Sequence, residues 1–251
     1  MRGSLRRWPA LCLTAVLATL ITACHGGGTS TGSSVLPQMS QLHSDSAFSP
    51  NSLSPIKIFQ GEVVGADDMF KPHDGDTKTG GQGNPVDKLP CSATEYLTDY
   101  HIHMYLGIVD HGKQIAVPDA IGLKNPGPET SGYISTAGCY YYLHTHDASG
   151  MIHVESPNKL PPSATVYTLQ NVLDVWGMKY SHTSFGPFKG ELRVFVGNPS
   201  AIGVTTVDHY AQFKGQLGTI PIKTHEVVWI EIGKPVTKAK ALPPVTFYTE
   251  Y

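Results

Sequence analysis

The sequence contains no run of lysine or arginine, and its 18 basic residues are outnumbered by 20 acidic ones. Binding to nucleic-acid phosphates depends on clustered basic side chains, so we expect no nucleic-acid partner. Beyond residue 24 there is no apolar stretch of the ~20 residues that a membrane-spanning helix needs. A P-loop, a dinucleotide-binding glycine motif and an HExxH zinc motif are also missing. The sequence therefore predicts none of the enzyme classes that these motifs mark.

The first 23 residues have the pattern of a secretion signal. Three arginines precede an apolar stretch, residues 11–21, that is too short to span a bilayer. The segment ends in Ile-Thr-Ala-Cys at Cys24, which resembles the bacterial lipobox, whose cysteine is lipidated and becomes the new N-terminus. We therefore expect a signal peptide over residues 1–23 and a lipid on Cys24. The alternative is an ordinary cleaved signal peptide that happens to contain a cysteine.

The expected mature chain is acidic and reaches the membrane only through its lipid. Removing the signal takes three arginines and no acidic residue away, which shifts the formal net charge from −2 to −5. His25, and not aspartate, follows the lipidated cysteine, and by analogy with lipoprotein sorting this predicts the outer membrane of a bacterial envelope. Residues 24–55 are rich in Gly, Ser, Thr and Pro and predict a flexible tether. Residues 56–251 suffice for a single β-rich globular domain.

Cysteine is scarce, with four in the chain, and only two are expected to remain in the mature domain without a lipid. Cys12 leaves with the signal peptide, and Cys24 takes the lipid. Cys91 and Cys139 remain, and because an exported protein enters an oxidising compartment we expect one disulfide between them. The alternative is that both thiolates bind a metal ion, although neither cysteine belongs to a CxxC pair.

Long helical periods are also scarce, whereas glycine and proline are frequent, with 26 and 19 residues. Strands or hairpins are expected at residues 56–64, 100–118, 139–156, 191–196 and 226–232, and a loop at residues 122–138. Residues 168–178 have their apolar side chains on one helical face, with Thr168 as the N-cap. We predict a β-dominated α+β domain, an antiparallel or mixed sheet with one short packed helix, compatible with a β-grasp-like arrangement. A cupin-like barrel or a β-sandwich is the alternative.

Histidine is abundant, and six of the twelve histidines fall between residues 101 and 153, five of them, all but His111, in a regular pattern. Side chains two residues apart in a strand point to the same face of the sheet. His101 and His103 should therefore project together. The same spacing predicts that His144 and His146 also project together, and two imidazoles placed in this way can reach one metal ion.

A fifth histidine and a carboxylate join this set if the second segment folds about its Asp-Ala-Ser-Gly turn. In that register His144 faces His153, and His146 faces Met151. Glu155 then continues the same face of the hairpin. A slip of one residue would move one strand's side chains to the opposite face, so the histidine pattern and the turn support each other.

The histidine pattern predicts a transition-metal site. Imidazole ligands suit Zn, Cu, Fe and Ni, whereas oxygen-only sites suit Ca and Mg, and we expect Cu or Zn. The expected ligands are His101, His103, His144, His146 and His153. Asp147 and Glu155 are expected either as further ligands or as acceptors that orient a ligating imidazole. Met104 is expected to point away from its neighbour His103, into the core.

Three functions are compatible with this pattern. The first is a lipid-anchored envelope protein that binds Cu or Zn through the histidines. The second is a metal-dependent enzyme, a hydrolase or an oxygenase, in which Glu155 or Asp147 acts as a general base on metal-bound water. The third is a structural envelope lipoprotein without metal, in which the histidines only form hydrogen bonds that tie strands together.

The central part of the chain resembles an uncharacterised family of exported bacterial proteins and lipoproteins. The resemblance rests on P-V-D-x-x-x-C at residues 85–91, Y-H-I-H at residues 100–103 and, above all, C-Y-Y-Y-L-H-T-H-D-A-S-G-M-I-H-V-E-S-P at residues 139–157. It implies export and no particular activity. The cupin family also has an HxH pair, but the glutamate and glycine spacing that cupins place around theirs is missing here.

Overall fold

The computed structural model describes residues 55–67, 75–76, 78–199, 205–233 and 242–248. The expected signal peptide, the lipidation site Cys24 and the expected tether up to residue 54 lie outside the described residues. Within the part that is described, no helix is both long and apolar enough to cross a membrane.

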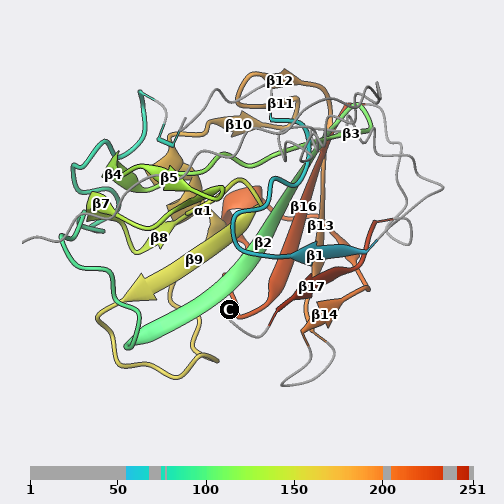
Figure 1. The fold of residues 1–251 in the computed structure, drawn as a ribbon. Helices are drawn as coiled ribbons and strands as arrows, with labels where there is room; N and C mark the ends of the chain where they lie inside the picture. The colour runs from blue at the N-terminus through green and yellow to red at the C-terminus, as the bar shows by residue number, and fades with distance from the viewer. Residues whose placement is uncertain (1–54, 68–74, 77, 200–204, 234–241, 249–251) are drawn as a thin grey trace, which may run out of the picture. The chain divides into compact units, whose positions relative to one another are not determined.

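A seven-stranded mixed sheet forms the centre of the fold (Figure 1). Its strands, in spatial order, are β15 (Ala211–Phe213), β13 (Leu192–Gly197), β16 (Glu226–Ile232), β2 (Tyr100–Asp110), β9 (Met151–Ser156) and β8 (Leu143–His144), with β3 (Lys113–Ile115) also paired to β2. The pairing of β16 with β2 is parallel, and every other pairing is antiparallel. The long strand β2 pairs with three neighbours, β16, β9 and β3, and is therefore the central strand of the sheet.

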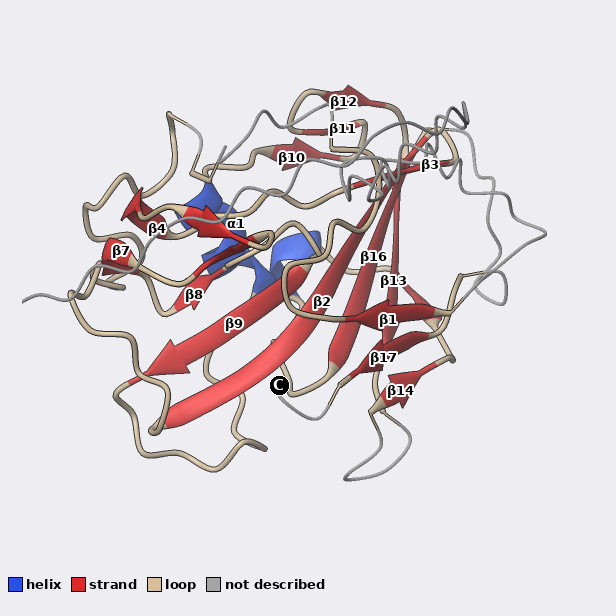
Figure 2. Ribbon diagram, in the orientation of Figure 1, coloured by secondary structure: helices blue, strands red, loops and turns tan. Residues whose placement is uncertain are grey.

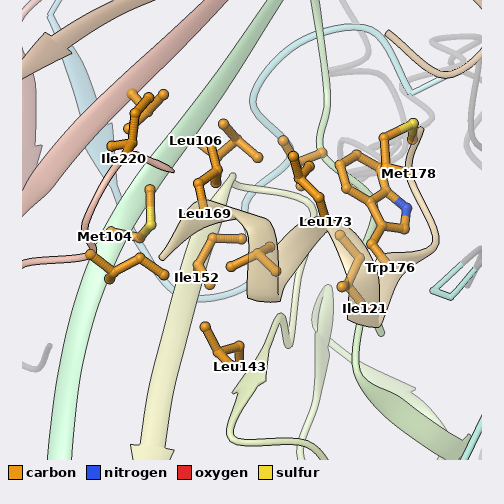
Figure 3. Close-up of a cluster of buried hydrophobic side chains, with 14 of the residues drawn as sticks. Met104, Leu106, Ile121, Leu143, Ile152, Leu169, Leu173, Trp176, Met178 and Ile220 are labelled. Atoms are coloured by element: carbon orange, nitrogen blue, oxygen red, sulfur yellow. The ribbon is translucent and has the colours of Figure 1, made fainter. Parts of the chain in front are cut away.

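One face of this sheet is covered by the helix α1 (Leu169–Trp176), as Figure 3 shows. Alternate residues of β2, among them Met104 and Leu106, point toward the helix and are fully buried. The helix begins at Thr168, whose backbone N–H donates to the side-chain carbonyl of Asn171, and it ends at Gly177 in the left-handed region. Because these residues of β2 pack against α1, the alternate residues of β2 lie on the opposite face of the sheet.

A smaller three-stranded sheet packs against part of the opposite face. It consists of β1 (Ile56–Ile58), β17 (Val245–Phe247) and β14 (Thr206–Val207). Ile58 and Phe247 share a buried apolar cluster with Tyr105 of β2 and Trp229 of β16. In Figure 1 β1 crosses in front of the strands of the main sheet. This cluster stops at Tyr105, and the two preceding residues on the same face of β2 are histidines.

The remaining strands are short and lie around the main sheet. They are β4 (Leu123–Pro126) with β7 (Ala137–Tyr140), β5 (Glu129–Thr130) with β6 (Tyr133–Ile134), and β10 (Tyr180–Ser181) with β11 (Ser184–Phe185) and β12 (Phe188–Lys189); a 3-10 turn, η2, covers Leu217–Thr219. The expectation of a plain loop over residues 122–138 is wrong, because four of these strands lie in it. The strand expected over residues 56–64 is shorter and ends at Ile58.

The predicted fold class is confirmed, since the described chain is a β-dominated α+β domain with one short α-helix (Figure 2). The alternative of a cupin-like barrel is wrong for the described residues, because the main sheet has open edges at β15 and β8. Both expected hairpin regions form antiparallel pairs, and the expected helix has the predicted N-cap.

Candidate metal centre

The five histidines come together on the face of the main sheet that also carries the second apolar cluster. His103 of β2, His153 of β9 and His144 of β8 lie side by side across three neighbouring strands, as the backbone register pairs them. In the next row His101 of β2 lies opposite Glu155 of β9. The predicted pairing of His144 with His153 is therefore confirmed, and the i, i+2 rule correctly places the histidines of β2 together.

His146 also lies in this cluster, but the pairing of the strands does not place it there. Strand β8 ends at His144, so the expected pairing of His146 with Met151 is not made. His146 instead stacks on the ring of Tyr133, with ring centroids 4.7 Å apart, and its Nδ1 lies 2.6 Å from the carbonyl oxygen of Ile134. These contacts hold its Nε2 atom 3.1 Å from Nε2 of His144.

Asp147 occupies a structural position and belongs to neither group of converging ligand atoms. One of its carboxylate oxygens accepts the backbone N–H of Gly61 at 2.8 Å, and the other accepts the backbone N–H and the hydroxyl of Ser149. These bonds use both oxygens to fix the turn that precedes β9. The expectation that Asp147 serves the metal site as a ligand or acceptor is therefore replaced by a role in holding this turn.

Glu95 is a member of the site that the sequence did not reveal. Its Oε1 atom lies 2.9 Å from Nε2 of His146 and 3.5 Å from Nε2 of His144. Burial by itself raises the pKa of Glu95, but its hydrogen bonds with these two imidazoles outweigh burial and lower the pKa to about 2. Glu95 is therefore an anion that faces two imidazole nitrogens at any physiological pH.

The segment that carries Glu95 is held in place by a disulfide. Cys91 and Cys139 are bonded, with their Cα atoms 5.4 Å apart, so the predicted pairing is present. Backbone hydrogen bonds in both directions between Ser92 and Tyr140 add to this link. Glu95 follows Cys91 by four residues, so the bridge fixes the start of the loop that brings the carboxylate to the cluster.

Glu155 is the most buried carboxylate of the site, with a side chain only 1% exposed. Oε1 lies 3.1 Å from Nε2 of His101 and 3.5 Å from Nδ1 of His153. No N–H or O–H donor is aligned with either of its oxygens, which is costly for a buried carboxylate. Burial raises its pKa, but the contact with His101 and the charges of neighbouring imidazoles outweigh burial and lower the pKa.

Hydrogen bonds to backbone carbonyls fix the tautomers of three imidazole rings. Nδ1 of His101, of His144 and of His146 lies 3.0, 2.8 and 2.6 Å from a carbonyl oxygen. A carbonyl oxygen only accepts hydrogen bonds, so each Nδ1 carries the proton and donates it. In the neutral ring the lone pair is then on Nε2, which in all three residues points into the cluster, as it does in metal-ligating histidines.

The surroundings of the histidines shift their pKa values in different directions. Burial lowers the pKa of His103 and of His153 well below 6.5, and charge on neighbouring imidazoles lowers it further. Burial also acts to lower the pKa of His101, but the adjacent carboxylate of Glu155 outweighs it and raises the pKa above 6.5. At neutral pH the two central rings are therefore neutral and able to act as ligands.

A cleft of about 300 Å³ leads from the surface to the cluster. Its lining includes the polar side chains of His101, Glu95, Gln60, Tyr133 and Ser135. The side chain of His101 is 27% exposed and that of Glu95 is 18% exposed, whereas His144 and His153 lie beneath them. The cluster is thus reachable by a small ion or ligand from solvent.

Two overlapping groups of side chains have ligand atoms that all lie within 4.8 Å of one another. The groups are His144, His146, His153 and Glu155, and His101, His103 and His153. Imidazole nitrogens and carboxylate oxygens converging in this way can hold a transition-metal ion. The fold and the site together define a β-rich domain with a buried histidine–carboxylate cluster. No family model, curated protein or solved structure matches this chain.

Proposed function

We propose that this protein is a lipid-anchored component of a bacterial cell envelope that binds a transition metal, Cu or Zn, through the histidine–carboxylate cluster. The choice of metal rests on the donors of the cluster, which are imidazoles and carboxylates and include no thiolate and no ring of backbone carbonyls. Such donors favour Zn or Cu over Ca or Mg. The envelope location and the anchor rest on the N-terminal sequence alone.

One observation carries the metal proposal. Nε2 of His144 lies 3.1 Å from Nε2 of His146, and the Glu95 carboxylate lies 2.9 Å from the second of them; when both rings are neutral, with Nδ1 protonated, these nitrogens present lone pairs to each other and to the carboxylate. Three hydrogen-bond acceptors therefore converge, and this arrangement is repulsive unless a cation lies among them. A single proton can be shared by only two of these acceptor atoms, whereas one metal ion can bind all three at once.

A second candidate, a metal-dependent hydrolase, is favoured by the cleft. A catalytic metal keeps a position open for water or substrate, and the approach past His101 gives solvent access to the cluster. In this function the general base would be a carboxylate beside the metal, and Glu155 is the one aimed at the cluster. Asp147 is outside both groups of converging ligand atoms, and its oxygens accept hydrogen bonds from the turn before β9.

The metal proposal is tested by the metal content of the full chain, exported without a His-tag, purified in detergent and analysed by plasma mass spectrometry. We expect the wild type to hold at least one equivalent of Zn or Cu. A His103→Ala/His146→Ala variant is expected to lose at least ~10-fold in affinity, because it removes ligands themselves and not only their supports. A His182→Ala/His209→Ala variant removes two exposed histidines outside the cluster and should bind as the wild type does.

A wild type that holds no metal, and takes up none when Cu and Zn are supplied, would overturn the metal proposal. The cluster would then be a proton-sharing network of the structural kind. Equal metal loss in both double variants would instead place the bound metal on the surface and away from the cluster.

The proposed anchor is tested by Cys24→Ser. Acyl chains on this residue contribute about 0.8 kcal/mol for each buried CH₂ group, so their loss should abolish membrane attachment. We expect the wild type in the membrane fraction and labelled by radioactive palmitate, and the variant unlabelled. An unlabelled wild type that is recovered soluble would show that the signal peptide is an ordinary cleaved one.

A further inference from the structure

The cluster contains more donors than one metal ion can use. Five imidazoles and two carboxylates contribute ligand atoms, whereas a tetrahedral ion takes four and an octahedral ion takes six. The seven side chains are His101, His103, His144, His146, His153, Glu95 and Glu155. Their distances to one another divide them into two sets with one carboxylate between them.

The first set lies toward the mouth of the cleft. Nε2 of His103 lies 2.9 Å from Nε2 of His101 and 3.1 Å from Nδ1 of His153. With metal–nitrogen bonds of about 2.1 Å, separations of this size correspond to angles of about 90–95° at a shared ion. Nε2 of His103 is thus spaced from each of the other two nitrogens as two ligands of one metal ion are.

The second set uses other elements of the fold. It consists of Nε2 of His144, Nε2 of His146 and Oε1 of Glu95, which are separated by 3.1, 2.9 and 3.5 Å. The two imidazoles have their Nδ1 protons on backbone carbonyls, so both lone pairs are aimed inward. This set therefore offers a second ion two nitrogens and one oxygen.

Glu155 lies between the two sets. Its Oε1 atom is 3.1 Å from His101 and 3.5 Å from His153 in the first set, and 4.0 Å from His144 in the second. Neither of its oxygens has a hydrogen bond, although both are buried. A carboxylate that bridges two cations would use both oxygens, as in two-metal sites with ions about 3.5–4 Å apart.

We infer that the cleft holds two divalent transition-metal ions side by side, one on His101, His103 and His153 and one on His144, His146 and Glu95. Glu155 bridges the pair. This inference rests on the proposed metal-binding function and extends it from one ion to two. Because two dications outweigh two carboxylates, the centre keeps a positive charge that faces the cleft, and small anions are the expected ligands there.

The test is the stoichiometry and magnetism of the full chain loaded with Cu²⁺ and freed of loosely held ions. We expect about two ions per chain, and a copper signal in electron paramagnetic resonance well below the value for two isolated ions, because bridged ions couple. A His101→Ala/His103→Ala variant and a His144→Ala/His146→Ala variant should each keep about one ion. Each should show the full signal of an isolated copper, and His182→Ala/His209→Ala should match the wild type.

The outcomes separate the two proposals. A wild type with one ion, whose signal is that of isolated copper, overturns the two-ion centre and leaves metal binding standing. Two ions without magnetic coupling overturn the bridge by Glu155. No bound ion overturns the proposed function together with this inference. The wild-type values decide these points without any variant, so a variant that fails to fold does not affect them.

Discussion

In metal-free protein, the pair His103 and His153 is expected to cost about 2–3 kcal/mol of the free energy of unfolding for each pH unit that the pH falls below about 6, measured against a variant that lacks both rings. The cause is the pair His103 and His153, whose pKa values in the folded protein burial lowers well below 6.5. Below pH 6.5 the unfolded chain binds protons on both residues, and the folded chain does not. Each proton of difference contributes about 1.4 kcal/mol per pH unit, so acid favours the unfolded state.

The other groups of the cluster act in different pH windows. The raised pKa of His101 contributes stability that is complete below pH 6.5 and is lost as the pH rises through its folded pKa. The lowered pKa of Glu95 contributes stability that is present above 4.5 and is lost as the pH falls toward about 2. Between pH 6 and 5 neither group offsets the loss that His103 and His153 cause.

The measurement is urea unfolding of the full chain in chelator at pH 7, 6 and 5. A His103→Asn/His153→Asn variant removes both titrating rings and should lack the loss that they cause, whereas Asp76 and Glu226, whose raised pKa values act in the opposite direction, remain in both proteins. The His182→Ala/His209→Ala variant retains them and should follow the wild type. If the wild type and the His103→Asn/His153→Asn variant change in stability equally between pH 7 and 5, the two central imidazoles are not neutral in the folded protein, and the ligand roles assigned to them lose their basis.

The parts of the fold that depend on local rules were predictable from the sequence. The i, i+2 spacing placed His101 and His103 on one face, and the alternation continued correctly to Met104, which points into the core beneath α1. Thr168 and Gly177 marked the ends of the helix because their backbone preferences act within a few residues. These features depend on the chain's own periodicity and need no distant partner.

Features that depend on distant contacts were not predictable. The parallel pairing of β16 with β2 joins segments more than a hundred residues apart, and β1 pairs with β17 from near the opposite end of the chain. Glu95 carries no periodic signal, since it lies in a loop, and only the disulfide four residues before it indicates where it is held. Asp147 was misassigned because its neighbour in sequence, His146, turns inward while its own oxygens bind the turn.

The two-cysteine variant Cys91→Ser/Cys139→Ser is expected to lose about 4 kcal/mol of unfolding free energy, since the bridge closes a loop of 48 residues' separation. For a domain of this size that corresponds to a fall in Tm of roughly 8–16 °C. The cause is the greater freedom of the unfolded chain, together with release of the segment that ends at Glu95. Thermal unfolding followed by circular dichroism measures the first effect.

The second effect separates a structural bridge from one that also serves the metal. Without the disulfide, the segment of Glu95 keeps the hydrogen bonds of Ser92 with Tyr140, the edge-on contact of Tyr96 with Tyr142 and the contacts of Glu95 itself with the imidazoles, but loses its covalent tie. Metal affinity should therefore fall about 10-fold, in the range seen when the supports of metal ligands are removed. Glu95→Gln should weaken metal binding at least as much while leaving Tm much closer to the wild type. If the cysteine variant loses stability and binds metal unchanged, the bridge does not serve the metal; if Glu95→Gln also binds metal unchanged, Glu95 is not a ligand, and the ion assigned to it is held by His144 and His146 with Glu155 alone.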